Sequence, residues 1–295
     1  MITEQQFVAC LVGKSLSDHV LSVARVSKGI TNRVFKVRCA GGAFACRLND
    51  SGRTLKSYES NARQLNQLGV KTASVITADY SGQAFGIPFQ ILEWIDGQEL
   101  DEVIAHGSRS DIERFALAVA DALKKTRQWE GTAYGYMTSG EWIGSNNWVD
   151  VTRSSISRAK ESLGAAAGAA GVITALTSFA DRNYDELAAV PSMAYIDDWH
   201  FQNVFLTQDG LVGIDVDSIA FGDVRDLVGR SLWRFRDKAN GKEYVDLLLG
   251  HFKALAKRPF VAFYAALFGC YAPDIKENAT LKMEGLFELC SEFDI

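Results

Sequence analysis

Several residue patterns that mark common protein classes are absent from this chain of 295 residues. The five cysteines form no Cys-x-x-Cys pair and are odd in number, which argues against a disulfide framework or a zinc site and favours buried apolar thiols. The four histidines are scattered singly, which argues against a transition-metal enzyme. No Gly-x-Ser-x-Gly elbow is present, which argues against hydrolysis by a Ser/His/Asp triad.

Long apolar runs are also missing. None reaches the roughly 18 residues that a membrane-spanning helix needs. The N-terminus, residues 1–6, has neither the basic start nor the apolar stretch of a signal peptide. We therefore expect a cytoplasmic protein without a membrane partner. Hydrophobic residues at 47% and charged residues at 23% are typical of a globular protein, and the length suits one large or two modest domains.

The most informative stretch is residues 196–203, Ile-Asp-Asp-Trp-His-Phe-Gln-Asn, followed by residues 213–217, Gly-Ile-Asp-Val-Asp. It supplies in order a carboxylate, an amide and a second carboxylate, at Asp198, Asn203 and Asp215. One carboxylate can accept the proton of an attacking hydroxyl, while an amide and another carboxylate hold magnesium on nucleotide phosphates. The set predicts a phosphoryl-transfer site, although two neighbouring Asp residues alone often cap a helix or make a turn.

A hairpin would bring these side chains together. Residues 204–206 and 211–214 are short apolar runs, and the four residues between them, 207–210, end in Asp-Gly, a hairpin signal. Asn203 stands just before the first run and Asp215 just after the second. Two antiparallel strands would therefore place both oxygen ligands at the same end of the hairpin.

These motifs resemble those of the aminoglycoside phosphotransferase and choline kinase-like superfamily, relatives of protein kinases. Their catalytic loop commonly reads His-Gly-Asp-x-His-x-x-Asn, and their metal loop Ile-Asp-x-Gly or Ile-Asp-x-Asp. By that resemblance Asp198 is the catalytic Asp, His200 is a structural His of the loop, and Asn203 and Asp215 are the metal ligands. The resemblance implies an α+β, two-lobed protein-kinase-like fold, with a small antiparallel-sheet lobe before a larger, mainly helical one.

The chain departs from the family pattern in three places. Ile196 stands where the first His is usual, and Asp197 replaces the Gly before the base. Residues 222–227, Gly-Asp-Val-Arg-Asp-Leu, are similar to the family's Gly-Asp-Pro-x-x-Asp-Leu with one residue missing. We expect Asp226 there to anchor the loop to the following helix, and Asp217 to support or contact the metal.

Residues 1–97 are expected to form the amino-terminal, nucleotide-binding lobe. Polar and apolar residues alternate over 33–38 and again over 44–48, which predicts a hairpin. Apolar residues recur at three- and four-residue steps over 56–68, which predicts a helix ended by a glycine. A further strand is expected over 88–95. This order of elements is that of a kinase amino-terminal lobe.

Residues 98–295 are expected to form the mainly helical lobe that carries the catalytic and substrate-binding residues. The segment 164–171 is rich in Ala and Gly, and we interpret it as a close-packed or weak helix, not as a linker. The other predicted helices run from a cap at Ser110 or Asp111 to about residue 128, from about Asp150, and, as one or two helices, over 242–268.

A cation is needed to position the nucleotide phosphates. Residues 44–47, Phe-Ala-Cys-Arg, lie where the kinase pattern has Val-Ala-Ile-Lys, and strand alternation puts Ala45 and Arg47 on one face. Glu59 on the next helix is the expected partner that braces Arg47. The alternative is a surface Arg and an unrelated Glu near a helix start. Arg is not equivalent to Lys here, because its planar fork reaches phosphate differently.

Two further segments are expected to contact the nucleotide. The segment Gly29-Ile30-Thr31-Asn32 resembles the family's loop over the phosphates, and Gly29 and Asn32 are its candidate contacts. It lacks the full Gly-x-Gly-x-x-Gly pattern, so any tight turn could look the same. Glu93 to Ile95 would form the hinge that hydrogen-bonds the purine through backbone groups, with Trp94 serving packing.

Charge is divided unevenly between the two parts. Residues 1–97 contain 11 Lys/Arg against 7 Asp/Glu, and residues 98–295 contain 20 against 29. A basic first part and an acidic second part fit an anionic nucleotide and a cationic acceptor, although solvated faces could give the same split. So acidic a second part argues against nucleic acid as a partner.

The sequence therefore predicts an ATP- or GTP-dependent phosphotransferase with Mg²⁺ as cofactor, acting on a hydroxyl of a small molecule, as a monomer or homodimer. Protein phosphorylation is less favoured, because Asp215 is not followed by Asp-Phe-Gly-type and Ala-Pro-Glu motifs. The alternative is a pseudokinase, a nucleotide-binding or scaffolding module without turnover. The changes at Ile196, Asp197 and Arg47 motivate it, and the intact Asp198, Asn203 and Asp215 argue against it.

Overall fold

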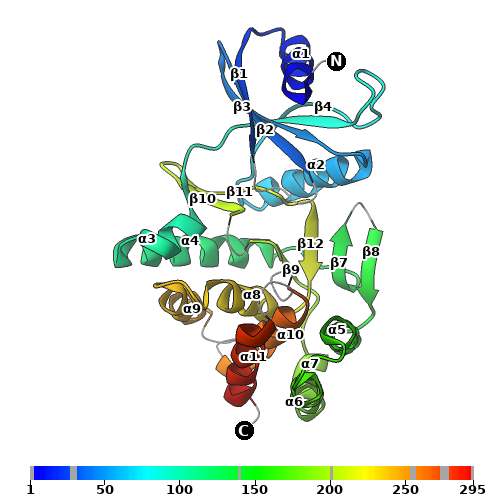
Figure 1. Cartoon of the computed structure of the whole chain (residues 1–295), viewed down its shortest axis with the longest axis vertical. Helices are drawn as coiled ribbons and strands as arrows, with labels where there is room; N and C mark the ends of the chain where they lie inside the picture. The colour runs from blue at the N-terminus through cyan, green and yellow to red at the C-terminus, as the bar shows by residue number, and fades with distance from the viewer. Residues whose placement is uncertain are drawn as a thin grey trace.

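The computed structural model describes residues 3–26, 32–138, 141–199, 202–252, 257–272 and 279–293. A sheet with two helices forms one end of the molecule, and a stack of helices forms the other (Figure 1). Short strands from distant parts of the sequence lie between them. None of the helices in the described ranges combines the length and apolar character needed to cross a membrane.

The first part of the chain contains a five-stranded antiparallel sheet. The hairpin predicted over 33–48 is confirmed, with Arg33 paired to Leu48 and Cys39 to Gly42. Gly42 has a φ of 146°, a conformation that side chains disfavour, at the turn of this hairpin. In spatial order the strands are β1 (Val20–Val26), β2 (Arg33–Cys39), β3 (Gly42–Leu48), β5 (Phe89–Glu93) and β4 (Val75–Asp79).

Two helices accompany this sheet, and they belong to different cores. Helix α1 (Glu4–Leu16), which the sequence analysis did not predict, packs Val8, Leu11 and Val12 into a small core with the sheet. Helix α2 (Gly52–Gln67) begins four residues before the expected start and sends its apolar face into the large core shared with the helical part. The expected division of the chain after residue 97 therefore stays a prediction.

Two small sheets link the ends of the molecule. The predicted hairpin is confirmed as β10 (Val204–Thr207) and β11 (Gly210–Gly213), paired from Val204–Gly213 to Thr207–Gly210. Strand β6 (Gln98–Glu99) adds to its free edge. The second sheet, which sequence reasoning missed, has the order β8 (Glu141–Ser145), β7 (Tyr134–Thr138), β12 (Ser218–Phe221) and β9 (Ala194–Tyr195).

The helical part confirms the predicted helices with two corrections. The first is the cap of the helix expected from Ser110 or Asp111, which lies earlier, at Ser108. Helix α4 (Arg109–Thr126) is capped by Ser108, whose hydroxyl accepts from the Asp111 backbone while the Asp111 carboxylate accepts from the Ser108 backbone. The second is the helix predicted over 164–171, which is wrong for residues 164–168 and right only for 169–171, the first turn of α6. Gly164 and Gly168 there have positive φ angles and form the turn between α5 (Trp148–Leu163) and α6 (Ala169–Arg182).

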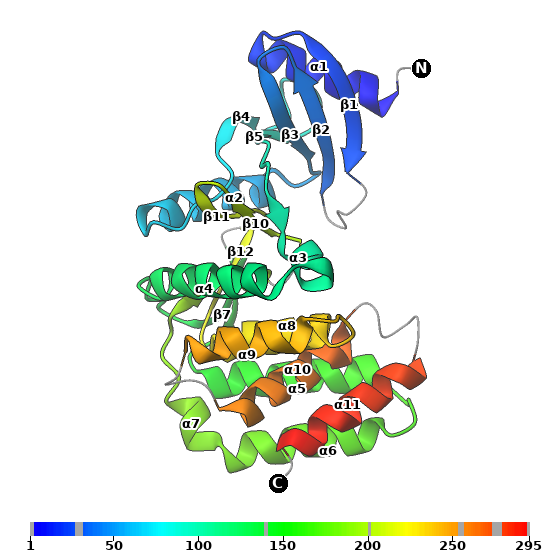
Figure 2. The ribbon, with the colours of Figure 1, turned by 90° about the vertical axis from the view of Figure 1, so that its left-hand side faces the viewer.

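The helices lie in successive layers below α4 (Figure 2). The central pair, α8 (Arg225–Phe235) and α10 (Arg258–Tyr271), is buried on nearly all sides, as expected of helices inside a large core. The remaining helices are α3 (Leu100–His106), α7 (Tyr184–Ala188), α9 (Gly241–Gly250) and α11 (Ala279–Phe293).

Gly213, at the end of β11, fixes the hairpin against the rest of the molecule. Its backbone oxygen accepts from Ala73 N at 3.2 Å, and its nitrogen donates to Lys71 O at 3.0 Å. A Cβ atom at this position would lie 1.9 Å from the ring of Trp199, which is 1% exposed. The missing side chain therefore lets the start of the 213–217 segment approach the loop that carries Asp198.

We predict that Gly213→Ala lowers the free energy of unfolding by about 1–3 kcal/mol, because the added methyl group would overlap the buried ring of Trp199. Denaturant melts of the variant and the parent protein measure the change. Gly250→Ala is the control, since no atom lies within 4 Å of its added Cβ and Ala favours a helix. Equal stability of the two variants would contradict the packing argument.

Candidate active site

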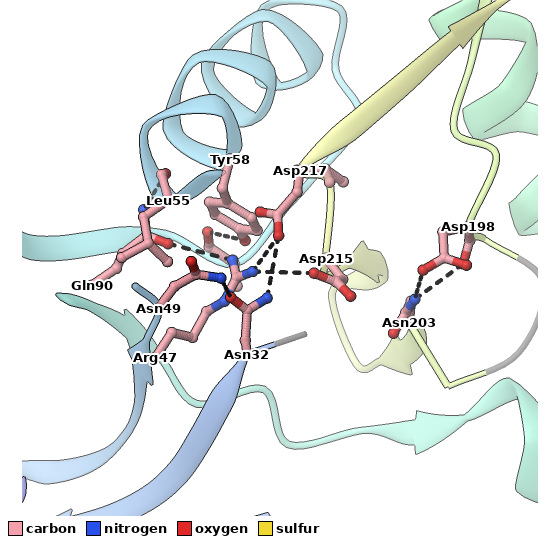
Figure 3. Close-up of polar contacts among 12 residues, drawn as sticks. Asn32, Arg47, Asn49, Leu55, Tyr58, Gln90, Asp198, Asn203, Asp215 and Asp217 are labelled. Carbon is pink, nitrogen blue, oxygen red and sulfur yellow. Dashed lines mark hydrogen bonds and ion pairs between the residues drawn. The ribbon is translucent and has the colours of Figure 1, made fainter. Parts of the chain in front are cut away.

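The polar residues predicted from the motifs gather where the five-stranded sheet and α2 meet the β10–β11 hairpin (Figure 3). Asp198 and Asn203 come from the loop before β10. Asp215 and Asp217 lie between β11 and β12, and Arg47 comes from β3. The site therefore joins segments that are more than 150 residues apart in the sequence.

Asn203 holds the catalytic candidate Asp198 in place. Its Nδ2 donates to Asp198 Oδ2 at 2.8 Å and to the Asp198 backbone oxygen at 3.2 Å. The backbone oxygen of Asn203 accepts from Ile214 N at 2.8 Å, which continues the hairpin ladder by one bond. The hairpin thus ties the loop of Asp198 to the segment of Asp215, as its sequence predicts.

Asp215 has an unusual backbone conformation. Its φ of 56° lies in the left-handed region, which is uncommon for residues other than glycine, although Asn and Asp tolerate it better than most. Its side chain is 41% exposed, and Oδ1 lies 3.1 Å from Arg47 Nη2. Figure 3 shows its carboxylate between the cluster around Arg47 and the Asp198–Asn203 pair. The carboxylate can therefore face a ligand bound between these groups.

Arg47 is buried, with 5% of its side chain exposed, and contacts both parts of the site. Its Nη2 lies 2.6 Å from Asp217 Oδ2, and its Nη1 donates to Gln90 Oε1 at 3.4 Å. The guanidinium carbon lies 4.9 Å from the centre of the Tyr58 ring. A charge this buried is stable only with such partners, so Arg47 links β3 to the segment after β11.

The predicted pair between Arg47 and Glu59 is wrong. The Glu59 carboxylate instead accepts from the Tyr80 hydroxyl at 2.7 Å and from Arg63 at 3.4 Å. Tyr58, the neighbour of Glu59 on α2, is the residue that faces the Arg47 guanidinium. Two carboxylates from the other side of the site attract Arg47 in place of the single one on α2.

Asn32 belongs to the same cluster. Its Nδ2 donates to Asp217 Oδ2 at 3.3 Å, and its Oδ1 accepts from Asn49 at 2.7 Å. Gly29, the other residue predicted from that loop, and His200 lie outside the described residues.

The proposed hinge residues line the end of β5. The Glu93 carboxylate accepts from the backbone and hydroxyl of Ser74 at 2.9 and 3.2 Å. Ile95 packs partly buried against the large core. Trp94 lies under the Lys36 ammonium, 4.1 Å from the ring centre. The contact of Glu93 and Ile95 with a nucleotide stays a prediction.

The pKa values of Asp198 and Asp215 are raised above the usual range of a carboxyl group. Burial, with the charges of Asp197 and Asp215, raises the pKa of Asp198 to about 7. The Asp215 carboxyl is 41% exposed, yet desolvation by the surrounding protein atoms raises its pKa to about 6; Arg47 opposes this, and Asp217 adds to the increase. Arg47 bonds Asp215 and Asp217, and Arg230 lies 3.4 Å from Asp197. The pKa values of Asp198 and Asp215 are raised in spite of these cations, so a further cation beside them would be stabilised.

A second network of hydrogen bonds and ion pairs begins at Asp197, the neighbour of Asp198, and the sequence motifs predicted only part of it. Asp197 replaces the family's Gly, and its Oδ2 lies 3.4 Å from Arg230. Arg230 also bonds Asp226 and the hydroxyl of Tyr136. Asp226 accepts from the Tyr195 hydroxyl at 2.9 Å, so it ties α8 to the strand before the Asp198 loop, as the motif at 222–227 suggests.

The oxygen atoms present suit a magnesium ion. Within the described residues, no three His, Cys, Asp or Glu side chains are grouped to hold a metal by themselves. Mg²⁺ commonly uses one or two protein oxygens and completes its shell with water and phosphate. Asp215 offers an exposed carboxylate, and Asn203 offers its amide oxygen since its nitrogen bonds Asp198. The Oδ2 of Asp217 bonds Arg47, but its Oδ1 is buried without a hydrogen-bond partner and is a further oxygen near this region.

Comparisons with solved structures show the same fold at low sequence identity. A thermostable mutant of the aminoglycoside phosphotransferase APH(4)-Ia matches with a TM-score of 0.74 at 14% identity, over 97% of this chain and 98% of that one. A ternary complex of such a mutant with ADP and hygromycin B has the same TM-score at 15% identity and the same coverage. A putative fructosamine-3-kinase from Thermobifida fusca reaches 0.64 at 16% identity, again over 97% and 98%.

At the level of sequence, no curated protein is significantly similar to the chain. The profile of the family described as "Phosphotransferase enzyme family" matches residues 22–263, most of the chain. The resemblance expected from the motifs, and the α+β kinase-like fold that it implied, are confirmed. The chain belongs to the phosphotransferase enzyme family.

Proposed function

We propose that the protein transfers the γ-phosphate of ATP or GTP to a hydroxyl group of a small molecule. The observation that carries this proposal is the convergence of Asp198, Asn203 and Asp215 beside the buried Arg47. Phosphoryl transfer depends on positioning and on neutralising charge, and these residues offer a proton acceptor, oxygen ligands and a fixed cation.

Each side chain has a role that follows from its contacts. Asp198 accepts the proton of the acceptor hydroxyl, and Asn203 keeps its Oδ2 in place through a 2.8 Å hydrogen bond. Asn203 and Asp215 would hold Mg²⁺, which supplies charge neutralisation on the phosphates. Arg47 can direct guanidinium hydrogens at the same phosphates while it remains bonded to Asp217.

A cationic acceptor, such as an aminoglycoside or an amino alcohol, fits the charge around Asp198. Burial raises the pKa of Asp198 most, and the charges of Asp197 and Asp215 raise it further, although Arg230 and Arg234 act in the opposite direction. An ammonium group of the acceptor would therefore reduce the remaining repulsion among the three acids. The excess of Asp and Glu over Lys and Arg in residues 98–295 would also attract a cationic acceptor, over a longer range. The neighbour solved with ADP and hygromycin B is consistent with this class of acceptor.

A nucleotide-binding module without turnover is the second candidate. The observation that favours it is the ion pair between Arg47 and Asp215, in which a carboxylate oxygen proposed to bind the metal instead contacts Arg47. Asp197, in place of a small Gly before the base, also favours it. Nucleotide consumption across a panel of amino sugars, amino alcohols and sugars separates the two functions, since a binding module would consume none.

Asp198→Asn should lower kcat by about 10²–10⁴-fold, because the amide cannot accept the hydroxyl proton, while nucleotide affinity stays near that of the parent. Steady-state kinetics and calorimetry measure the two quantities. Asp209→Asn removes the same charge from the exposed tip of the neighbouring hairpin and should leave both unchanged. If Asp198→Asn keeps full turnover, Asp198 is not the base.

Asp215→Asn should reduce the gain in nucleotide affinity that Mg²⁺ provides, because a neutral amide is a weaker ligand than a carboxylate. Asn also suits the left-handed backbone at this position, so the fold should be retained. Calorimetric titration of a non-hydrolysable ATP analogue with Mg²⁺ and with EDTA gives the difference. An unchanged magnesium effect would remove Asp215 from the ligand set.

Turnover should be lost as the pH falls. A protonated Asp198 cannot act as base, and its raised pKa of about 7 in the metal-free protein means that it is about half protonated near neutral pH. Bound Mg²⁺ would favour the ionised form, so the midpoint of kcat/KM against pH should lie at or below about 7. A profile that rises on acidification through this range would contradict the assignment.

A further inference from the structure

We propose that Asp217, and not a carboxylate on α2, is the positioning residue that holds Arg47 for the nucleotide phosphates. The inference rests on the proposed function and deepens it. In the expected arrangement Glu59 would hold Arg47, but Glu59 bonds Tyr80 and Arg63. The position of the Arg47 guanidinium would then be set by Asp217, which lies two residues after the proposed metal ligand Asp215.

The geometry separates Asp217 from Asp215 as partners of Arg47. Both carboxylates meet the same nitrogen, Nη2, but Asp217 is nearer, at 2.6 against 3.1 Å. Asp217 is also the more buried, with 15% of its side chain exposed against 41% for Asp215. An ion pair shielded from water is the stronger and the longer-lived of the two.

Asp217 is itself fixed by residues of the first lobe. Asn32 donates to the same Oδ2 at 3.3 Å, and Asn49 orients Asn32 by donating to its Oδ1 at 2.7 Å. Asn61 on α2 donates to the backbone oxygens of Val216 and Asp217 at 2.9 and 3.3 Å. Helix α2 therefore contributes through an amide bonded to the chain around Asp217, not through a carboxylate bonded to Arg47.

This arrangement divides the work between the two acids. When nucleotide and metal bind, Asp215 can leave Arg47 because its side chain is half open to solvent. Arg47 keeps its bond to Asp217 and still has guanidinium hydrogens for phosphate oxygens. Only Val216 lies between the proposed metal ligand Asp215 and Asp217, which bonds Arg47. The positions of the metal ligand and of the phosphate-binding Arg47 are therefore coupled through this short segment.

The competing explanation is that Asp217 is a metal ligand. Its Oδ1 is buried without a hydrogen-bond partner and could face a cation. The two explanations differ in one measurable respect. A positioning residue affects nucleotide binding with or without metal, whereas a metal ligand affects it only with metal.

The test compares Asp217→Asn with Glu59→Gln in calorimetric titrations of a non-hydrolysable ATP analogue, in Mg²⁺ and in EDTA. Asp217→Asn should weaken binding by about 10- to 100-fold in both conditions, as expected for losing a hydrogen bond between charged groups. Glu59→Gln keeps an acceptor for Tyr80 and should change binding less than about threefold. Weakening by Glu59→Gln as large as that by Asp217→Asn, or weakening by Asp217→Asn in Mg²⁺ alone, would overturn the proposal.

A double-mutant cycle tests whether Asp217 acts through Arg47. Once Arg47→Ala is present, adding Asp217→Asn should weaken binding no further. Full additivity would mean that Asp217 acts by another route. If thermal melts show that Asp217→Asn does not fold, Asn32→Ala replaces it, because it loosens Asp217 without removing its charge. Asn32→Ala should weaken nucleotide binding in the parent protein but should cause no further weakening in the Arg47→Ala variant. Weakening in both backgrounds would count against the proposal.

These titrations contain no acceptor, so their outcome is independent of turnover. If no acceptor is phosphorylated but binding depends on Asp217 as described, the proposed function fails and the role of Asp217 stands. If turnover is found but Asp217→Asn binds nucleotide as the parent does, the role of Asp217 fails and the proposed function stands.

Discussion

The site depends on one buried cation, the Arg47 guanidinium, held between carboxylates from a distant part of the chain. Withdrawing such a group from water is costly, and the structure compensates with two acids, the Gln90 amide and an aromatic face. Because Arg47 belongs to the sheet and its acids to the segment after β11, the same contacts also connect the two ends of the molecule. Loss of one partner would leave a charge without compensation.

The β10–β11 hairpin positions Asn203 and Asp215, the residues of the site that do not depend on Arg47 alone. Its ladder continues through the bond between Ile214 and Asn203, so the amide of Asn203 and the carboxylate of Asp215 face the same region. Gly213 lets this hairpin lie against the Trp199 ring. Asp215 then takes a left-handed backbone, a conformation that costs free energy and is kept by the contacts around it. Local sequence and tertiary packing therefore act together.

How far the sequence predicts this structure depends on the range of the interactions. Hairpins such as β2–β3 and β10–β11 were predictable, because alternation and turn residues are local signals. The grouping of Asp198, Asn203 and Asp215 was predictable from spacing. The partner of Arg47 was not, because Glu59 and Asp217 are both acids and only the packing of α2 decides between them. The sheet of β7, β8, β9 and β12 combines strands from separate segments, and its short β9 carries little periodic signal.

The placement of α2 has a consequence for how the molecule holds together. Its residues Tyr58, Ala62 and Leu65 lie in the same apolar core as the helices of the second half, while Val8 and Leu11 of α1 lie in a separate one. A fragment ending near residue 97 would therefore expose the apolar face of α2 to solvent and tend to aggregate.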